Sequence, residues 1–278
     1  MSAETESFRP SRSDGRCRGR CRMARSVPFR AAAMAVVTGV LVAGISACGA
    51  SAADDEHPEH RSFALHGRTL TIDSDNSALE VVATDSAKAG TVDVTRWFQG
   101  SVVVGHDPTV RWSFRDDRLV LRVHCSGFIA DCSARHRIEV PRGISVKVDN
   151  GDGSVRAHGF RDPLSVDTAD GAVRVTDSSG PLDLTSDDGS VHADVSSRRV
   201  KADSSDGSVD VRLSGVPDRV DASSSDGAVT VGLPQGAYRV SAGSDDGAVS
   251  VSVPRDDRSP HRVSAHSSDG KVTVRTEK

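Results

Sequence analysis

The sequence has 278 residues and a formal net charge of −4 at pH 7, and only 4% of its residues are aromatic. A compact globule of this length would bury more large rings, because aromatic side chains carry the most apolar area per residue. The composition therefore predicts a thin, elongated body built from small and β-branched residues. The length allows one or two domains.

The N-terminal segment, residues 1–47, has the composition of an export signal and is set apart from the fold. After a basic start, Ala31–Gly44 is an apolar run of 14 residues, which is too short to cross a bilayer comfortably as a helix. Small residues then precede Cys48, an arrangement that resembles the lipobox of bacterial lipoproteins. We therefore expect a lipid (palmitate) on Cys48 that anchors the protein at the extracytoplasmic face of the cell membrane. The alternative is an ordinary signal peptide with an incidental cysteine, and either Met1 or Met23 can be the true start.

Export changes how the charge and the cysteines are interpreted. Removing the eight arginines and three acidic residues of the first 48 residues leaves 27 basic and 36 acidic side chains, a net charge of about −9. This dispersed negative charge argues against nucleic acid as a partner. Cys125 and Cys132 remain as an even pair in an oxidising compartment, so we expect a disulfide. A metal or redox site is the alternative, but no His or Cys partner has a suitable spacing.

Two further segments precede the most regular part of the chain. Residues 48–61 are polar and acidic, and we expect a flexible tether. Residues 62–140 show short alternating runs separated by turn signals, and they hold nearly all the mature aromatic residues. Because the terminal unit of a solenoid must differ from interior units, this segment is predicted to be an irregular, aromatic-filled β cap. A sugar-binding platform formed by Trp97 and Trp112 is the alternative to core packing.

Residues 141–278 are organised around the dipeptide Asp-Gly, which returns at intervals of 18 to 23 residues. An alternating run precedes each dipeptide and another follows it, which puts valine, leucine and alanine on one face and polar residues on the other. A fixed period near about 20 residues indicates a repeat architecture. The residues expected at the repeat turns are Asp152, Gly153, Asp170, Gly171, Asp188, Gly189, Asp206, Gly207, Asp226, Gly227, Asp246, Gly247, Asp269 and Gly270.

Two all-β architectures fit this pattern: a β-solenoid of short two-strand coils, or a meander of Asp-Gly hairpins. The near-constant period favours the solenoid, in which each strand pairs with its counterpart one repeat later and Val173 lies beside Val191. We attribute the turn residues to aspartate bonding its own backbone and to glycine supplying positive φ. The last strand, Lys271–Arg275, is bracketed by basic residues that discourage edge-to-edge joining, so we expect a monomer.

The lipobox, the segment DRLVLRVHCSG…CSARHRIEVPRG at residues 117–143 and the repeated Ser-Asp-Gly-Ser/Ala-Val coils resemble the bacterial "putative adhesin" β-strand-repeat family (domain of unknown function 4097). The likeness covers about residues 62–278. It implies a β-solenoid carried on the outside of the cell. It implies no established activity, and no functional residue is carried over from it.

The motifs of common catalytic and metal sites are missing from the sequence. We find no nucleophile elbow, HExxH helix or paired-carboxylate constellation, so we expect no enzyme, catalytic residue, cofactor or metal ligand. We expect instead a surface-anchored lipoprotein acting as a structural or interaction module, with an unknown protein or cell-wall polymer as partner. The alternatives are an extracytoplasmic sensor or accessory subunit of a membrane partner, a glycan-active enzyme and a calcium-dependent binder.

Overall fold

The computed structural model describes residues 51–102, 106–127 and 130–277. The expected export signal and Cys48 lie outside these residues. Within the described ranges, none of the helical segments has the length and apolar character needed to cross a membrane.

The described part of the chain is all-β apart from one short 3-10 turn, η1 (Ala52–Asp54). The strands before the regular repeats are β1 (Glu59–Ala64), β2 (Thr69–Ser74), β3 (Ser77–Thr84), β4 (Thr91–Val102), β5 (Thr109–Arg115), β6 (Arg118–His124) and β7 (Ala130–Pro141). The strands of the repeats are β8 (Ser145–Asn150), β9 (Val155–His158), β10 (Leu164–Thr168), β11 (Val173–Thr176), β12 (Leu182–Ser186), β13 (Val191–Val195), β14 (Arg199–Ser204), β15 (Val209–Leu213), β16 (Arg219–Ser224), β17 (Val229–Leu233), β18 (Arg239–Ser244), β19 (Val249–Val251), β20 (Arg262–Ser267) and β21 (Val272–Thr276).

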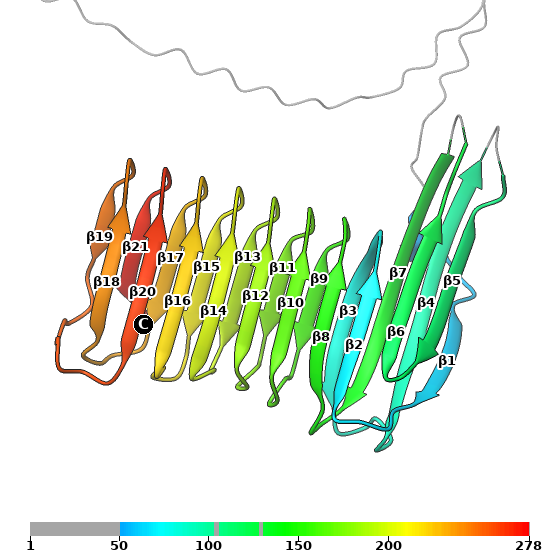
Figure 1. Cartoon of the computed structure of the whole chain (residues 1–278), viewed down its shortest axis with the longest axis horizontal. Coiled ribbons are helices and arrows are strands. Elements are labelled where there is room, and N and C mark those ends of the chain that lie inside the picture. The colour runs from blue at the N-terminus through cyan, green and yellow to red at the C-terminus, as the bar shows by residue number, and fades with distance from the viewer. Residues whose placement is uncertain (1–50, 103–105, 128–129, 278) are drawn as a thin grey trace, which may run out of the picture. The chain divides into compact units, whose positions relative to one another are not determined.

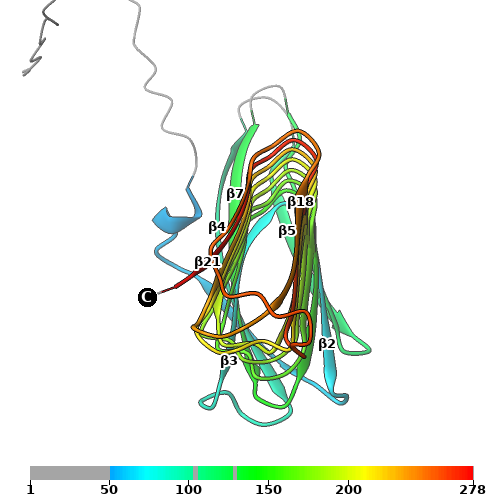
Figure 2. The ribbon, with the colours of Figure 1, turned by 90° about the vertical axis from the view of Figure 1, so that its left-hand side faces the viewer.

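Each repeat is one coil that gives one strand to each of two facing sheets (Figures 1 and 2). Strands β8, β10, β12, β14 and β16 are consecutive neighbours in one sheet, and β9, β11, β13, β15 and β17 in the other. The pairing is parallel and in register, so Val173 lies beside Val191 and Leu164 beside Leu182. This confirms the β-solenoid and excludes the hairpin meander.

Alternate residues of both sheets fill the narrow space between them. Val173, Val191, Val209 and Val229 form one continuous line, and none is more than 1% exposed. Burying a valine stabilises the fold by roughly 1.5–3 kcal/mol relative to leaving it in water. Because a like residue lies directly above and below, each coil is packed by its neighbours rather than by large rings, which accounts for the low aromatic content.

The repeat glycines are required by close packing and not by an unusual backbone conformation. Positive φ occurs at Gly90, Gly143 and Gly159, and at none of the repeat-turn glycines. A Cβ added to Gly189 would lie 2.2 Å from the carbonyl oxygen of Gly171, and equivalent contacts recur along the stack. The expectation that these glycines supply positive φ is therefore wrong, since glycine is needed where one coil approaches the backbone of the next.

A hydroxyl three residues before the glycine, and not the aspartate, supplies the hydrogen bonds of the corner. Ser186 Oγ accepts the N–H of Gly189 at 2.9 Å and donates to the carbonyl of Gly171 in the preceding coil at 3.1 Å. Ser204 repeats this arrangement. The hydroxyl thereby satisfies two backbone groups that would otherwise be left unpaired. The expected bond from aspartate to its own backbone is not formed at Asp188, whose side chain has no hydrogen bond or ion pair among the described residues.

Spatial order and chain order differ at both ends of the stack. Strands β6 and β7 form a coil outside that of β2 and β3, and β20 and β21 insert between β16/β17 and β18/β19. Strand β21 therefore lies between β17 and β19 (Figure 1), with Val272 beside both Val229 and Val249. The strand expected at the free edge, Lys271–Arg275, is an interior strand. Its charges consequently give no support to a monomer, and the edge strands at this end are β18 and β19.

Antiparallel strands close the other end of the stack. Strand β4 pairs antiparallel with β7 and with β1, and β5 pairs antiparallel with β6. Phe63 stacks on Phe114 with ring centroids 5.1 Å apart and meets Trp112 edge-on at 6.3 Å. This confirms the aromatic-rich β cap. Cys125 and Cys132 form the expected disulfide, with Cα atoms 6.2 Å apart.

The segment expected as a flexible tether, residues 48–61, is part of the fold from Ser51 onward. Asp55 accepts the backbone N–H of Phe98 in β4 at 2.9 Å, and this hydrogen bond lowers the pKa of its carboxyl group. Strand β1 begins at Glu59 and pairs with β4 from that residue. The acidic composition suggested a free linker, but this segment includes the start of a paired strand.

Candidate functional site

The predicted repeat-turn residues lie together along one long edge of the stack, which we call the aspartate edge. Its carboxylates are exposed, and neighbouring coils are about 4.8 Å apart. From Asp170 onward, the aspartates of the repeat dipeptides have no hydrogen bond or ion pair among the described residues. Within the described ranges, no three His, Cys, Asp or Glu side chains are arranged to hold a metal ion. This edge is therefore a line of uncompensated negative charge.

A second line of charge, of opposite sign, lies at the other end of the strands in the ten-stranded sheet. Four arginines occupy the first position of neighbouring strands: Arg199 beside Arg219, Arg219 beside Arg262 and Arg262 beside Arg239. The residue after each arginine is a valine that points between the sheets, so the arginine itself points outward. We call this set the arginine row. At about 4.8 Å per strand, its four Cα atoms span about 14 Å.

Only part of the arginine row is neutralised within the protein. Arg219 forms an ion pair with Asp221 on the same strand, and this hydrogen bond raises the pKa of its guanidinium. Arg239 donates to the backbone carbonyl of Asp257 at 2.6 Å. The side chains of Arg199 and Arg262 have no hydrogen bond or ion pair among the described residues.

The coil itself does not require arginine at this position. The corresponding positions, immediately before β10 and β12, are prolines, Pro163 and Pro181, which precede the paired Leu164 and Leu182. Like charges on adjacent strands destabilise a sheet by a few tenths of a kcal/mol to about 1 kcal/mol. The arginine row is thus a surface feature that folding alone does not explain.

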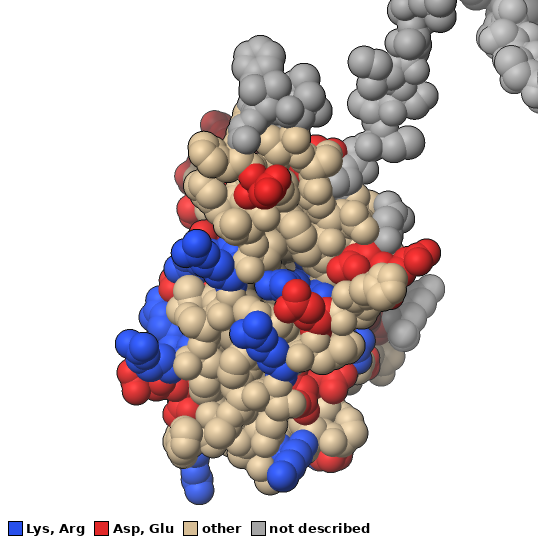
Figure 3. All heavy atoms as spheres, turned by 90° about the vertical axis from the view of Figure 1, so that its right-hand side faces the viewer, with Lys and Arg blue, Asp and Glu red and all other residues tan. Residues whose placement is uncertain are grey.

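A hollow of about 600 Å³ lies at the aromatic end of the stack, on the end face shown in Figure 3. We call it the end hollow, and its lining residues are Glu59, Arg61, Arg96, Val110, Arg111, Trp112, Ser113, Val120 and Arg122. They come from β1, β4 and the consecutive strands β5 and β6. Four arginines and one glutamate thus line the hollow together with one tryptophan.

Two of these arginines contact the face of Trp112. The guanidinium carbons of Arg61 and Arg96 lie 4.7 Å and 4.8 Å from the ring centroid, close enough for cation–π attraction. The Arg96 side chain is only 11% exposed; it forms an ion pair with Glu59 and donates to the carbonyl of Val110 at 3.1 Å. Trp112 is 8% exposed, and its indole N–H has no hydrogen-bond partner.

The other two arginines, Arg111 and Arg122, are cross-strand neighbours on β5 and β6. Arg122 is held by Asp73 at 2.8 Å and by Asp75 at 3.3 Å. Burial raises the pKa of Asp73, but hydrogen bonds from Arg118 and Arg122 outweigh it, so the carboxyl pKa is lowered and the group stays ionised. Arg111 is exposed and has no hydrogen bond or ion pair among the described residues.

A buried histidine lies next to the end hollow. His136 is fully buried, neither ring nitrogen has a hydrogen-bond partner, and its ring lies 6.4 Å from that of Trp112. Burial, helped by the nearby charge of Arg96, lowers its pKa to about 3. The imidazole is therefore neutral at physiological pH and adds no charge to this end.

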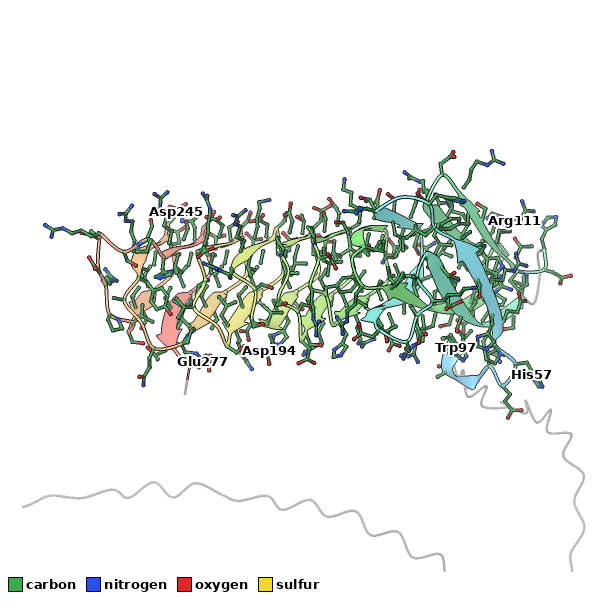
Figure 4. All side chains as sticks on the ribbon, turned by 90° about the horizontal axis from the view of Figure 1, so that it is seen from below. His57, Trp97, Arg111, Asp194, Asp245 and Glu277 are labelled. Carbon is green, nitrogen blue, oxygen red and sulfur yellow. A yellow bond between two sulfur atoms is a disulfide. The ribbon has the colours of Figure 1, made fainter. Side chains whose placement is uncertain are left out.

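The two tryptophans do not form a sugar-binding platform. Trp112 packs between the sheets, whereas Trp97 alternates to the outer face of β4, where the Arg135 guanidinium lies 5.2 Å from its ring centroid. Figure 4 shows Trp97 and Arg111 on opposite sides of this end. Core packing, the expectation for both tryptophans, is confirmed for Trp112 and wrong for Trp97, which lies on the outer face of the sheet. Sequence reasoning singled out neither the arginine row nor the end hollow.

Stacked two-strand coils with serine–glycine corners and a capped aromatic end place the protein among parallel two-sheet β-solenoids. More specifically, the chain belongs to the Toastrack DUF4097 family, whose model matches residues 131–278. No curated protein matches the sequence.

Solved structures with a similar chain course come from three bacteria. A "putative adhesin" from Bacteroides fragilis is 15% identical, with a TM-score of 0.48 over 80% of this chain and 98% of that one. A "putative adhesin" from Parabacteroides merdae is 9% identical, also with a TM-score of 0.48, over 80% and 97%. A "putative cell adhesion protein" from Clostridium sporogenes is 12% identical, with a TM-score of 0.33 over 80% and 100%.

Proposed function

We propose that the protein is a surface-anchored lipoprotein that acts as an adhesin-like interaction module. A lipid on Cys48 holds it at the extracytoplasmic face of the membrane, and the arginine row binds an anionic cell-wall polymer. The observation that carries this proposal is the register of four exposed arginines on neighbouring strands.

The chemistry of the arginine row suits a phosphate- or carboxylate-bearing polymer. A guanidinium presents donors in a planar fork that matches both groups, and it loses little hydration when it binds them. Arg199 and Arg262 are available for this, because neither side chain forms a hydrogen bond or ion pair among the described residues, although the charge of Arg199 helps to lower the pKa of Asp218. The net charge of about −9 after export keeps a polyanion away from most of the surface. The polymer is therefore directed to the arginine row.

The position of the fold relative to Cys48 supports an anchored module. Three residue steps separate Cys48 from Ser51, where the described fold begins, and a fully extended chain covers at most about 3.6 Å per residue. A lipid on Cys48 would hold the β1 end of the solenoid close to the membrane surface. The arginine row, on the later coils, would then lie toward the wall.

Two measurements test the proposal. Labelled palmitate should enter the wild-type protein and not Cys48→Ala, and Cys48→Ala should leave the membrane fraction. Purified cell walls should co-sediment residues 49–278, and Arg199→Gln/Arg262→Gln should bind several-fold less. Arg156→Gln/Arg174→Gln is the matched control, because these two arginines are neighbours on the other sheet and also have no ion pair among the described residues. Equal wall binding by both double variants would reject the arginine row.

A further inference from the structure

We infer that the end hollow is a second binding site, for a phosphate group carried by a small ester or by a lipid headgroup. It lies on a different surface from the arginine row and uses different residues. The inference does not depend on the proposed wall binding.

The local charge of the end hollow is positive. Four arginines and one glutamate, Glu59, line it, in a protein whose exported part is net negative. Glu59 pairs with Arg96, and Asp73 and Asp75 behind the wall pair with Arg122. Arg61 and Arg111 have no carboxylate partner among the described residues, so two positive charges in the lining are not balanced. An anion in the hollow would balance them, and it would do so where the protein surface is concave.

The four arginines of the end hollow fall into two pairs, one bonded within the protein and one not. Arg96 is bonded to Glu59 and to the Val110 carbonyl, and Arg122 is bonded to Asp73 and Asp75, so these two maintain the walls. Arg61 and Arg111 line the same hollow without a hydrogen bond or ion pair among the described residues. Arg61 is oriented by its contact with Trp112. Arg61 is thus held in place and Arg111 is accessible. Each guanidinium can donate two parallel hydrogen bonds to a phosphate group.

The lining also contains a residue with an unsatisfied polar group. Trp112 is more than nine-tenths buried, and its indole N–H has no partner in the described protein. A buried N–H normally has a hydrogen-bond acceptor. Phosphate oxygens are acceptors, whereas the guanidinium groups on this ring are donors only. An anion bound beside the ring, or the water that accompanies it, would supply the acceptor that the indole N–H lacks.

The test uses residues 49–278, which contain every described element. Calorimetric titrations at low salt use inorganic phosphate and glycerol 3-phosphate, with Trp112 emission as a second readout in a Trp97→Phe background. A separate arm measures co-sedimentation with vesicles of phosphatidylglycerol or of phosphatidylcholine. We expect saturable one-to-one binding in at least one arm. Arg61→Gln/Arg111→Gln should weaken it about tenfold or more, which corresponds to at least one strong charge-assisted contact.

The control is Arg156→Gln/Arg174→Gln, which removes the same charge from exposed positions outside the end hollow. It should change affinity less than about twofold, and thermal melting should show that both double variants are folded. Binding of the soluble phosphates identifies a free ester, and binding of phosphatidylglycerol vesicles alone identifies a headgroup. Absence of binding in both arms, or equal weakening by the two double variants, overturns the inference. Neither result affects the wall-binding assay, which uses Arg199 and Arg262.

Discussion

The fold makes a specific prediction for the glycine of a repeat corner, Gly207. Replacing it with alanine places a Cβ 2.2 Å from the Gly189 carbonyl oxygen and 2.5 Å from its carbonyl carbon, both main-chain atoms. Ordinary contacts of a Cβ begin at 3.4 Å. The obstacle is backbone rather than the flexible end of a side chain, so no rotamer change can remove it. The two coils must separate at this corner.

The cost can be worked out from the bonds that hold the two coils together there. Ser204 Oγ donates to the Gly189 carbonyl at 2.9 Å, and the N–H groups of Ser205 and Asp206 donate to the Asp187 carbonyl at 3.0 Å and 2.9 Å. Each such bond contributes a net 0.5–1.5 kcal/mol or so, and overpacking alone costs about 1–3 kcal/mol. We therefore expect Gly207→Ala to lower the free energy of unfolding by about 3 kcal/mol or more.

Gly143→Ala is the matched control. Gly143 has a positive φ of 85°, but nothing lies within 4 Å of an added Cβ, so the substitution incurs only the left-handed backbone penalty of about 1–2 kcal/mol. Denaturant unfolding of residues 49–278, followed by far-UV circular dichroism, measures both variants. The reasoning fails if Gly207→Ala is no more destabilising than Gly143→Ala, because backbone conformation, and not coil spacing, would then explain the repeat glycines.

Two further predictions concern the capped end. The pKa of His136 is lowered from 6.5 to about 3, so between these pH values the unfolded chain binds a proton that the folded chain does not, and stability falls as the pH falls. From pH 6.5 to 4.5 the loss should be about 2–3 kcal/mol, and His136→Leu should remove most of it; identical pH profiles for the two proteins would contradict this. Cys125→Ser/Cys132→Ser should lower stability by roughly 2–3 kcal/mol, the loop-closure value for a separation of seven residues. Reduction of the wild type should produce the same loss, and an unchanged denaturation midpoint would count against it.

The core of the repeats could be predicted from the sequence because it depends on a local rule. Alternation decides which side of a strand each residue faces, and the repeat period decides which residue becomes its neighbour. Val173 beside Val191 follows from these two facts. The reason for the glycines could not be predicted in the same way. It is the closeness of neighbouring coils, which would place an added Cβ 2.2 Å from a carbonyl oxygen of the adjacent coil. In the sequence, the dipeptide Asp-Gly indicates only an ordinary turn.

The order of the last two coils could not be read from the alternation, because β18/β19 and β20/β21 share the same pattern. Strand β20 pairs with β16 and with β18 in the same register, so the residue pattern does not distinguish its two neighbours. The available signal is the interval of 23 residues between the last two Asp-Gly dipeptides, longer than the intervals of 18 to 20 before it. The extra residues belong to the connection between β19 and β20, which must return across the end of the stack so that the final coil can insert.

The end hollow was beyond sequence reasoning for a different reason. Arg61, Arg96 and Trp112 belong to three strands, and antiparallel pairing of β1 with β4 and of β5 with β6 brings them together. No periodicity links these positions. The arginine row, in contrast, could have been found from the repeats: Arg199, Arg219, Arg239 and Arg262 each precede the first valine of a repeat. The arginine row was missed because every outward-facing residue of the repeats was assigned to solvent.

The corner chemistry also bears on how a partner would approach. Serine supplies the corner's hydrogen bonds and glycine allows the close approach, whereas the aspartates of the repeat dipeptides from Asp170 onward form no side-chain hydrogen bond or ion pair among the described residues. Their recurrence creates a line of uncompensated negative charges along one edge, with neighbouring coils about 4.8 Å apart. Such a line repels a polyanion and also the same edge of a second copy. The arginine row lies at the opposite end of the strands, so the two lines of charge would orient an anionic polymer along one side of the solenoid before any specific contact forms.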